Sequence, residues 1–81
     1  MTVRVKLFAI LRDRAGVADL ALDLPDGATV AQAKGPLLAR LPLLADHLDR
    51  CGFAVNLAYV KPDVPLHDGD ELALIPPVSG G

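Results

Sequence analysis

The sequence predicts an α+β domain in which one main helix packs across a mixed β-sheet. Near the N-terminus, apolar and charged residues alternate as in a half-buried strand, and a second strand pattern follows closely. One helical period comes next, and three further strand patterns occupy the second half of the chain. A hairpin, then a helix, then more strands is an order typical of the α+β class.

The first two strands are expected to form a wide hairpin. Val3, Val5 and Leu7 alternate with charged residues and so form one apolar face, and the same parity places Phe8 on the solvent face. The second strand covers residues 18–24, where three leucines at alternate positions form the inner face. The connection between the strands is short and charged, and we expect it to hold one helical turn.

The main helix follows a turn at Pro25-Asp26-Gly27, three residue types that favour turns. Thr29 and Gln32 have the spacing of a capping box, which begins a helix. Gly35-Pro36 interrupts the pattern, because a proline inside a helix removes a backbone bond and clashes with the preceding turn. We expect either a kink or a helix that restarts with Pro36 in its first turn. The apolar face of this helix consists of Val30, Ala33, Leu37 and Leu41.

The second half of the chain completes the sheet. Parity in the last strand points Leu72 and Leu74 inward and Ile75 outward. The first and last strands are expected to be neighbours at the sheet centre, which makes the arrangement a β-grasp, or ubiquitin-like, roll. We therefore expect one domain, 1–75, followed by an extended flexible tail, 76–81. The predicted elements here are a short helix at 43–49 and strands at 53–57, 59–60 and 71–75, and a turn is expected to begin at Asn56.

Composition narrows the function classes. The 81 residues are 52% hydrophobic and 22% charged, which suits one small folded domain. A net charge of −2 with scattered basic residues argues against nucleic-acid binding. No apolar run approaches the roughly 18 residues of a membrane span, and the first residues lack a signal-peptide pattern. The expected location is the cytoplasm.

Residues that often carry chemistry are isolated in this sequence. Cys51 is the only cysteine, so we expect a half-buried apolar role, with a reactive thiol or a surface position as alternatives. His47 and His67 have no partner in a recognisable motif. The acidic run at 68–71 is interpreted as a tight turn and not as a metal site. The sequence predicts no metal site, and no nucleophile paired with a general base is visible.

The clearest functional signal is Gly80-Gly81 at the end of the sequence. A strand leads into it through Pro76-Pro77, and prolines favour an extended exit from the fold. Glycines lack a Cβ and can pass along a narrow channel, so we expect a carboxylate at the tip of a thin arm. A frayed, glycine-rich terminus is the alternative. Because a carboxylate must be activated before it reacts, and no phosphate-binding loop is present, a partner enzyme is expected to activate it.

A group of apolar residues on the solvent face is the second candidate feature. Parity places Phe8 and Ile75 outward on the first and last strands, and Tyr59 is a third candidate member. A contiguous exposed apolar patch marks an interface, whereas single exposed apolar residues are ordinary surface. The choice between an interface and ordinary surface depends on whether these residues lie close together in the folded chain.

Several stretches of the sequence resemble the small, sulfur-carrying subunit of molybdopterin synthase. The final motif, P-P-V-S-G-G, is specific, and the similarity spans essentially the whole chain. The interruption at Gly35-Pro36 is a departure, because members of that family usually have an unbroken helix. The matching stretches are 5–9 with Arg12, 24–30, 53–56, 65–72 and 75–81.

The resemblance implies a β-grasp fold and a sulfur carrier that is not catalytic alone. A partner resembling ubiquitin-activating enzymes, an adenylyltransferase, uses ATP to adenylate Gly81, and a sulfur donor enzyme converts the adenylate into a thiocarboxylate. No cofactor is implied for this chain itself. The tail then enters the large subunit of molybdopterin synthase, which transfers the sulfur to the pterin precursor of the molybdenum cofactor. Two large and two small subunits form the family's heterotetramer.

The resemblance also assigns site residues by matching position. Gly81 carries the reacting carboxylate and Gly80 precedes it in the tail. A β-grasp sulfur carrier for thiazole or cysteine synthesis is one alternative, and a ubiquitin-like modifier or binding module is another. An autonomous enzyme is disfavoured. The implied partner-binding residues are Phe8, Arg12, Tyr59, Ile75, Pro76, Pro77, Val78 and Ser79.

Overall fold

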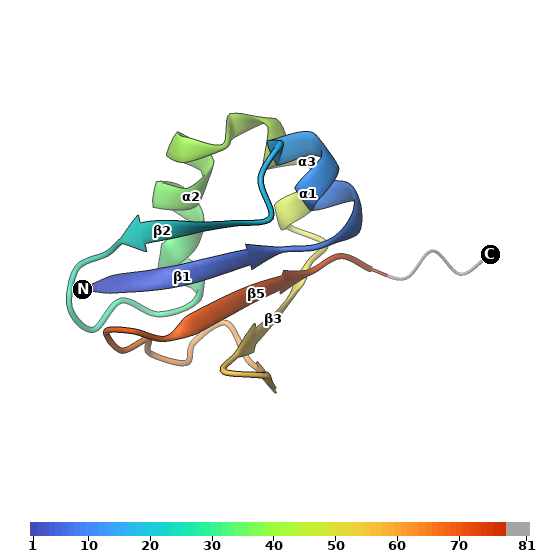
Figure 1. Cartoon of the computed structure of the whole chain (residues 1–81). Coiled ribbons are helices and arrows are strands. Elements are labelled where there is room, and N and C mark those ends of the chain that lie inside the picture. The colour runs from blue at the N-terminus through green and yellow to red at the C-terminus, as the bar shows by residue number, and fades with distance from the viewer. Residues whose placement is uncertain (78–81) are drawn as a thin grey trace.

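The computed structural model describes residues 1–77 and confirms the predicted α+β architecture. A five-stranded mixed sheet has the order β2-β1-β5-β3-β4, and the helical segments lie on one side of it (Figure 1). Residues 78–81 of the predicted tail lie outside the described residues. The strands are β1 (Thr2–Leu7), β2 (Asp19–Asp23), β3 (Gly52–Val55), β4 (Ala58–Val60) and β5 (Glu71–Ile75). The helical segments are α1 (Ala9–Ala15), η1 (Ala31–Ala33), α2 (Lys34–Arg40), η2 (Pro42–Leu44) and α3 (Ala45–Leu48).

The first and last strands are neighbours at the sheet centre, as predicted. β1 pairs with β2 in antiparallel fashion and with β5 in parallel fashion, and β5 pairs with β3 in antiparallel fashion. The inner face of these strands packs against the helical layer and forms one apolar core. The fully buried side chains include Val3, Val5, Leu7, Leu22, Leu72 and Leu74 from the strands and Leu11, Leu37, Leu44 and Leu48 from the helical layer.

The connection between β1 and β2 holds more helix than predicted. The expected single turn is instead the seven-residue helix α1. The burial of Leu11 explains why the helix is longer than one turn, because this fully buried side chain packs α1 against the core. The helix ends at Gly16, whose left-handed φ of 78° suits a residue without a Cβ.

The main helix begins as predicted and restarts at the glycine-proline pair. The capping box is present in both directions: the Thr29 N–H donates to Gln32 Oε1 at 2.9 Å, and the Gln32 N–H donates to Thr29 Oγ1 at 3.3 Å. The chain first forms the 3-10 turn η1 and then α2, where Pro36 is the third residue. A first-turn residue needs no backbone N–H bond inside the helix, so the restart accommodates the proline.

The third predicted strand is shorter than expected at its C-terminal end. β3 ends at Val55, and Asn56 and Leu57 have positive φ values of 50° and 73°. Two consecutive left-handed residues form the kind of two-residue turn that joins strands of a hairpin. The prediction that a turn begins at Asn56 is confirmed, and the inclusion of Leu57 in the strand was wrong.

Candidate functional site

The face of the sheet opposite the helices brings residues from four strands into one row. Lys6 on β1 pairs with Ala73 on β5, Ala73 pairs with Ala54 on β3, and Ala54 pairs with Tyr59 on β4. We call this surface the outer face. The alanines are only 8% and 6% exposed, so larger neighbours on this face cover them.

The three predicted apolar residues lie near the end of the outer face at which β5 ends. Ile75 pairs with Gly52, and Phe8 follows directly after Leu7, which pairs with the residue before Ile75. Tyr59 Cε1 lies 4.0 Å from the point where a Cβ on Gly52 would stand, so its ring leans over that glycine toward Ile75. We call Phe8, Tyr59 and Ile75 the apolar patch.

Exposure differs among the members of the apolar patch. Phe8 is 44% exposed and Tyr59 is 77% exposed, which makes both available to a partner. Ile75 points outward as parity predicted but is half-buried. Sequence reasoning missed the small residues beneath the patch, because only the register of β3 against β5 shows that Gly52 and Ala54 share this face.

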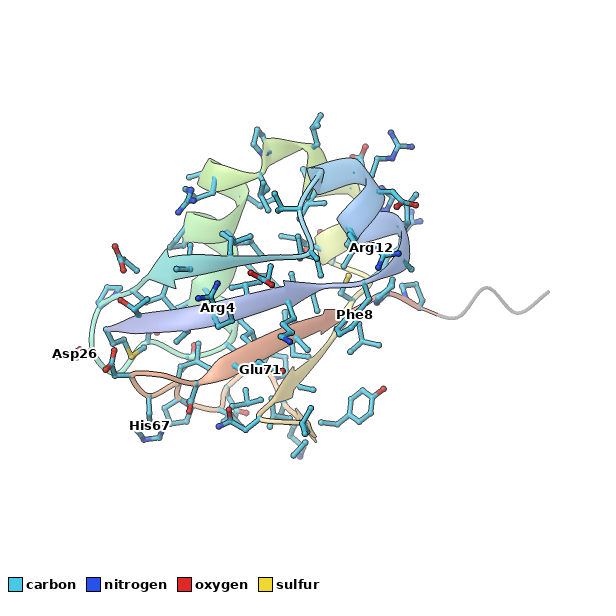
Figure 2. The ribbon with its side chains drawn as sticks, viewed as in Figure 1. Arg4, Phe8, Arg12, Asp26, His67 and Glu71 are labelled. Atoms are coloured by element: carbon cyan, nitrogen blue, oxygen red, sulfur yellow. The ribbon has the colours of Figure 1, made fainter. Side chains whose placement is uncertain are left out.

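The apolar patch lies where the chain leaves the sheet toward the tail. β5 ends at Ile75, and Pro76 is half-buried while Pro77 is exposed. Figure 2 shows Phe8 at the end of β1, beside the carboxyl end of β5. Arg12 is exposed on α1, and its backbone N–H donates to the Phe8 carbonyl at 3.5 Å, so it borders the patch.

The remaining predicted site residues fall outside what the structure describes. Gly80 and Gly81, with Val78 and Ser79 before them, belong to residues 78–81. Their assignment as the reacting tail stays a prediction. The described part of the chain supplies the surface from which that tail departs.

Cys51 occupies the half-buried position that the sequence predicted. Its thiol donates to the His47 carbonyl at 3.2 Å. Burial raises the pKa of the Cys51 thiol, and the positive charge of Lys34 opposes this only in part. A thiol with a raised pKa is a weak nucleophile at neutral pH, so the residue acts in packing.

The acidic run before β5 is a turn, as interpreted from the sequence. Gly69 has a left-handed φ of 84°. Asp70 Oδ2 accepts a bond from the His67 N–H at 2.8 Å, and Asp68 Oδ1 accepts one from the Thr2 N–H at 2.8 Å. Within residues 1–77, no group of three or more histidine, cysteine, aspartate or glutamate residues is placed to hold a metal ion.

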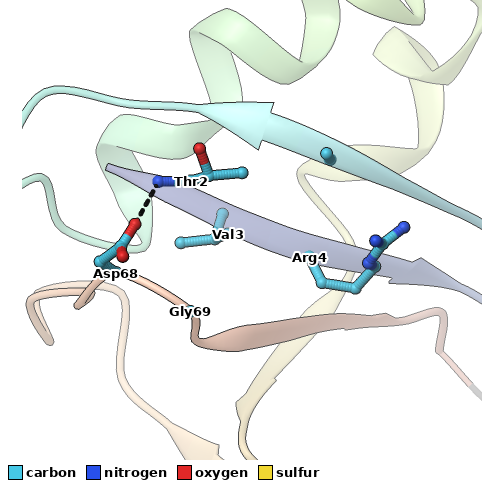
Figure 3. Close-up of a pocket in the computed structure, with 6 residues that line it drawn as sticks. Thr2, Val3, Arg4, Asp68 and Gly69 are labelled. Carbon is cyan, nitrogen blue, oxygen red and sulfur yellow. Dashed lines mark hydrogen bonds between the residues drawn. The ribbon is translucent and has the colours of Figure 1, made fainter.

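A cavity of about 340 Å³ lies beside the first residues of β1 (Figure 3). Its charged groups are already engaged: Asp68 bonds to the Thr2 N–H, and Arg4 Nη1 lies 3.0 Å from Asp19 Oδ1. The cavity is at the opposite end of β1 from Phe8, and the Thr2 hydroxyl that lines it donates to Asp23 Oδ1 at 2.8 Å. The cavity is therefore separate from the candidate site at the other end of β1.

Among the helices of residues 1–77, none has the length and apolar character needed to cross a membrane.

Comparison with known proteins identifies relatives along the whole chain. The sequence model of the ThiS family matches residues 5–81. The molybdopterin synthase sulfur carrier subunit of Chlamydomonas reinhardtii is 41% identical, and the alignment covers 100% of both chains. The protein of the same name from Arabidopsis thaliana is 37% identical over 98% of this chain and 82% of its own length.

Solved structures agree with these sequence relatives. Small archaeal modifier protein 1 of Haloferax volcanii superposes with a TM-score of 0.88 at 30% identity, over 95% of this chain and 98% of that one. A chain from the complex of subunits 1 and 2 of the molybdopterin-converting factor of Helicobacter pylori superposes with a TM-score of 0.70 at 27% identity, with both chains fully covered.

Proposed function

Because the chain belongs to the ThiS family, we propose that it is the sulfur-carrier subunit of a molybdopterin synthase. The observation that carries this proposal is the end-to-end match to proteins named molybdopterin synthase sulfur carrier subunit, at 41% and 37% identity. The fold supports it, because the central strand β5 leads directly into Pro76-Pro77 and onward in sequence to Gly80-Gly81.

The proposed chemistry takes place on the carboxyl group of Gly81. In an activating partner, a carboxylate oxygen attacks the α-phosphate of ATP, which forms an acyl-adenylate and releases pyrophosphate. Sulfur supplied by a donor enzyme at the oxidation level of sulfide then attacks the acyl carbon, AMP leaves, and a thiocarboxylate remains. In the large subunit the thiocarboxylate sulfur attacks a carbon of the pterin precursor and displaces an oxygen substituent, which joins carrier and precursor as a thioester. Water then cleaves the acyl–sulfur bond, which leaves the sulfur on the precursor and restores the carboxylate. The carrier holds the sulfur and the partners catalyse each step.

The apolar patch is proposed as the surface that docks on the large subunit. A structural relative was solved as a complex of subunits 1 and 2 of the molybdopterin-converting factor, which supports a partner of this kind. Six residues follow Ile75, and a fully extended chain of that length reaches at most about 20 Å. A partner that covers the patch therefore needs its active site within that distance.

A second candidate is a ubiquitin-like protein modifier. The likeness to small archaeal modifier protein 1, with a TM-score of 0.88, favours this class. The carboxyl group of Gly81 is then activated in the same way, but a lysine amine of another protein replaces the sulfur donor. Both candidates use an activated carboxyl group on Gly81. They differ in the group that attacks it, which is sulfur in the carrier and a lysine amine in the modifier.

The intact mass of the chain tests the carrier proposal. Incubation with its activating enzyme, ATP and a sulfur source is expected to raise the mass by the difference between sulfur and oxygen. Deletion of Gly81 is expected to abolish this change without altering the circular dichroism spectrum. An unchanged wild-type mass, with an activating enzyme that is active on another carrier, argues against sulfur carriage. Lysine adducts traced to Gly81 in cells favour the modifier.

A charge placed in the apolar patch tests the docking surface. Phe8→Asp is expected to weaken binding to the large subunit, because an aspartate would be buried against apolar side chains. Leu43→Asp is the matched control, since Leu43 is 71% exposed and belongs to η2 in the helical layer, on the side of the sheet opposite the outer face. Equal affinity of the two variants would show that the patch is not the docking surface.

A further inference from the structure

Lys6 brings a positive charge onto the outer face next to the apolar patch. Its neighbours along β1, Val5 and Leu7, point into the core, so Lys6 points outward. Across the parallel pairing it faces Ala73, and in the row Lys6, Ala73, Ala54, Tyr59 it stands opposite the patch tyrosine. The lysine is half-buried, so part of its side chain is already withdrawn from water.

The acidic residue nearest to Lys6 on the outer face is engaged by Arg4. Asp19 on β2 pairs in register with Lys6, yet its Oδ1 lies 3.0 Å from Arg4 Nη1. Glu71 on β5 also pairs in register with Arg4 (Figure 2). Within the described residues 1–77, Lys6 takes part in no ion pair. The Lys6 ammonium group is therefore available to pair with an acidic group on a partner.

A partner that covers the apolar patch also covers Lys6. Removing an ammonium group from water is costly unless an opposite charge or several hydrogen bonds replace the lost hydration. Charged groups at such positions fix register and reject partners that lack the complementary charge. Lys6 is thus placed to discriminate among apolar surfaces that would otherwise fit equally well.

We propose that Lys6 is a specificity-determining residue for docking and selects a large subunit that presents an aspartate or glutamate opposite it. This inference rests on the proposed docking of the apolar patch. A second copy of the chain fits less well, because Asp19 and Glu71 of that copy bond to or pair in register with its own Arg4. Nucleic-acid phosphate also fits poorly, since the net charge is −2 and Asp19 pairs in register with Lys6.

Binding of the full chain to the large subunit, measured by calorimetry at low and high salt, tests the role of Lys6. Lys6→Met keeps the length and removes the charge, which leaves the partner's carboxylate buried and unpaired. We expect at least a tenfold loss of affinity at low salt, equivalent to about 1.4 kcal/mol, and a larger loss for Lys6→Glu. The salt dependence of binding is expected to become shallower in Lys6→Met.

The control is Arg50→Met, which makes the same change in net charge at an exposed position after α3. It is expected to bind within about twofold of the wild type. Equal melting temperatures of the Lys6 variants and the wild type would exclude a folding effect. An acid-to-lysine substitution at the partner's contact is expected to restore binding to Lys6→Glu, which a purely structural role for Lys6 does not predict.

The outcomes separate this inference from the docking proposal. If Phe8→Asp abolishes binding while both Lys6 variants bind as well as the wild type, the patch docks and the role of Lys6 is wrong. Tighter binding by Lys6→Met would also overturn it, because it would mean that the lysine meets an apolar surface. If Phe8→Asp and the Lys6 variants all bind normally, the docking surface itself is misassigned.

Discussion

Leu57 adopts a backbone conformation that is unfavourable for a leucine. Its φ is 73°, and its side chain is 90% exposed, so no burial offsets the strain. Left-handed backbone costs an ordinary residue roughly 1–2 kcal/mol, mostly through the Cβ. Glycine is the usual residue at the second position of this type of hairpin turn. The strain therefore arises from the Leu57 side chain, and a glycine at this position would remove it.

Leu57→Gly is expected to increase the free energy of unfolding by about 0.5–1 kcal/mol, since the relief of strain exceeds the entropy that glycine adds to the unfolded chain. Urea unfolding measures the change. Ala58→Gly, on the adjacent strand residue with an ordinary φ, is expected to lower the free energy by a similar amount. Destabilisation by both substitutions would show that Leu57 is not strained.

At the scale of single residues, a backbone conformation was predictable only where the residue type itself favours that conformation. Asn56 marked the hairpin turn because asparagine tolerates left-handed backbone. Leu57 gave no such signal and was assigned to the strand. Phe8 was placed on the surface by parity alone, and its 44% exposure agrees with that prediction.

The helical layer consists of short elements joined at sequence interruptions. η1 and α2 together span residues 31–40, and Gly35-Pro36 lies near the junction. Gly35 does not have a positive φ, and a Cβ placed on it meets no atom within 4 Å. The one crowding group is the ring of Pro36, because proline Cδ disfavours a helical conformation for a preceding residue that carries a Cβ. Glycine therefore suits position 35 because the proline follows it.

In a Pro36→Ala background, Gly35→Ala is expected to raise the free energy of unfolding by about 0.5–1 kcal/mol, because alanine loses less backbone entropy in a helix and no proline ring then crowds its Cβ. Thermal unfolding followed by circular dichroism measures it. Gly27→Ala is the contrasting control: its surroundings are equally open, but a φ of 82° makes alanine strained, so that variant is expected to be less stable. Stabilisation by both would mean that backbone conformation at these glycines has no influence.

Element boundaries were predicted best where a local motif defines them. The Thr29–Gln32 capping box located the start of the main helix, and β5 has the predicted bounds. α1 was predicted as a single turn because the connection between the first two strands is short and charged. Its second turn depends on burial of Leu11, a tertiary contact that no local pattern reveals.

At the scale of the whole molecule, Asp70 links segments that are distant in sequence. Its Oδ1 accepts a bond from Asn56 Nδ2 at 3.0 Å, and its Oδ2 accepts one from the His67 N–H at 2.8 Å. Asn56 Oδ1 in turn accepts the Glu71 N–H at 3.0 Å. The hairpin turn, the loop before β5 and the start of β5 are joined by one carboxylate and one amide.

These bonds make stability depend on pH. The His67 N–H first, and then the Asn56 amide, lower the pKa of Asp70 from its ordinary value of 3.8. A lowered pKa stabilises the folded state above that ordinary value, and the contribution is lost as the pH falls through the lowered pKa. Asp70→Asn is expected to be less stable than the wild type at neutral pH, with a gap that narrows below pH 3.8.

Urea unfolding at neutral pH and at successive acidic values measures the gap. Asp63→Asn, at an exposed loop position, serves as the control and is expected to change stability less. A difference between wild type and Asp70→Asn that stays constant across the acidic range would contradict the role assigned to the Asp70 carboxylate.

The topology was predictable from the sequence, whereas the surface it creates was only partly so. Parity and the order of strands led to the central pair β1 and β5. The row of Lys6, Ala73, Ala54 and Tyr59 combines four strands, and its register follows from packing of the inner leucines. The sequence therefore predicted the three residues of the apolar patch, but it did not predict that the two alanines and Lys6 lie beside them.

The central position of β5 also has a mechanical consequence. β5 is bonded to β1 on one edge and to β3 on the other. A force applied along β5 at Pro76 acts on its hydrogen bonds to β1 and to β3 at the same time. Both sets of bonds are loaded in shear, so they do not break one after another. An enzyme that pulls on the end of this chain, or withdraws the end from a tight channel, therefore pulls against a strand that is hydrogen-bonded along both edges.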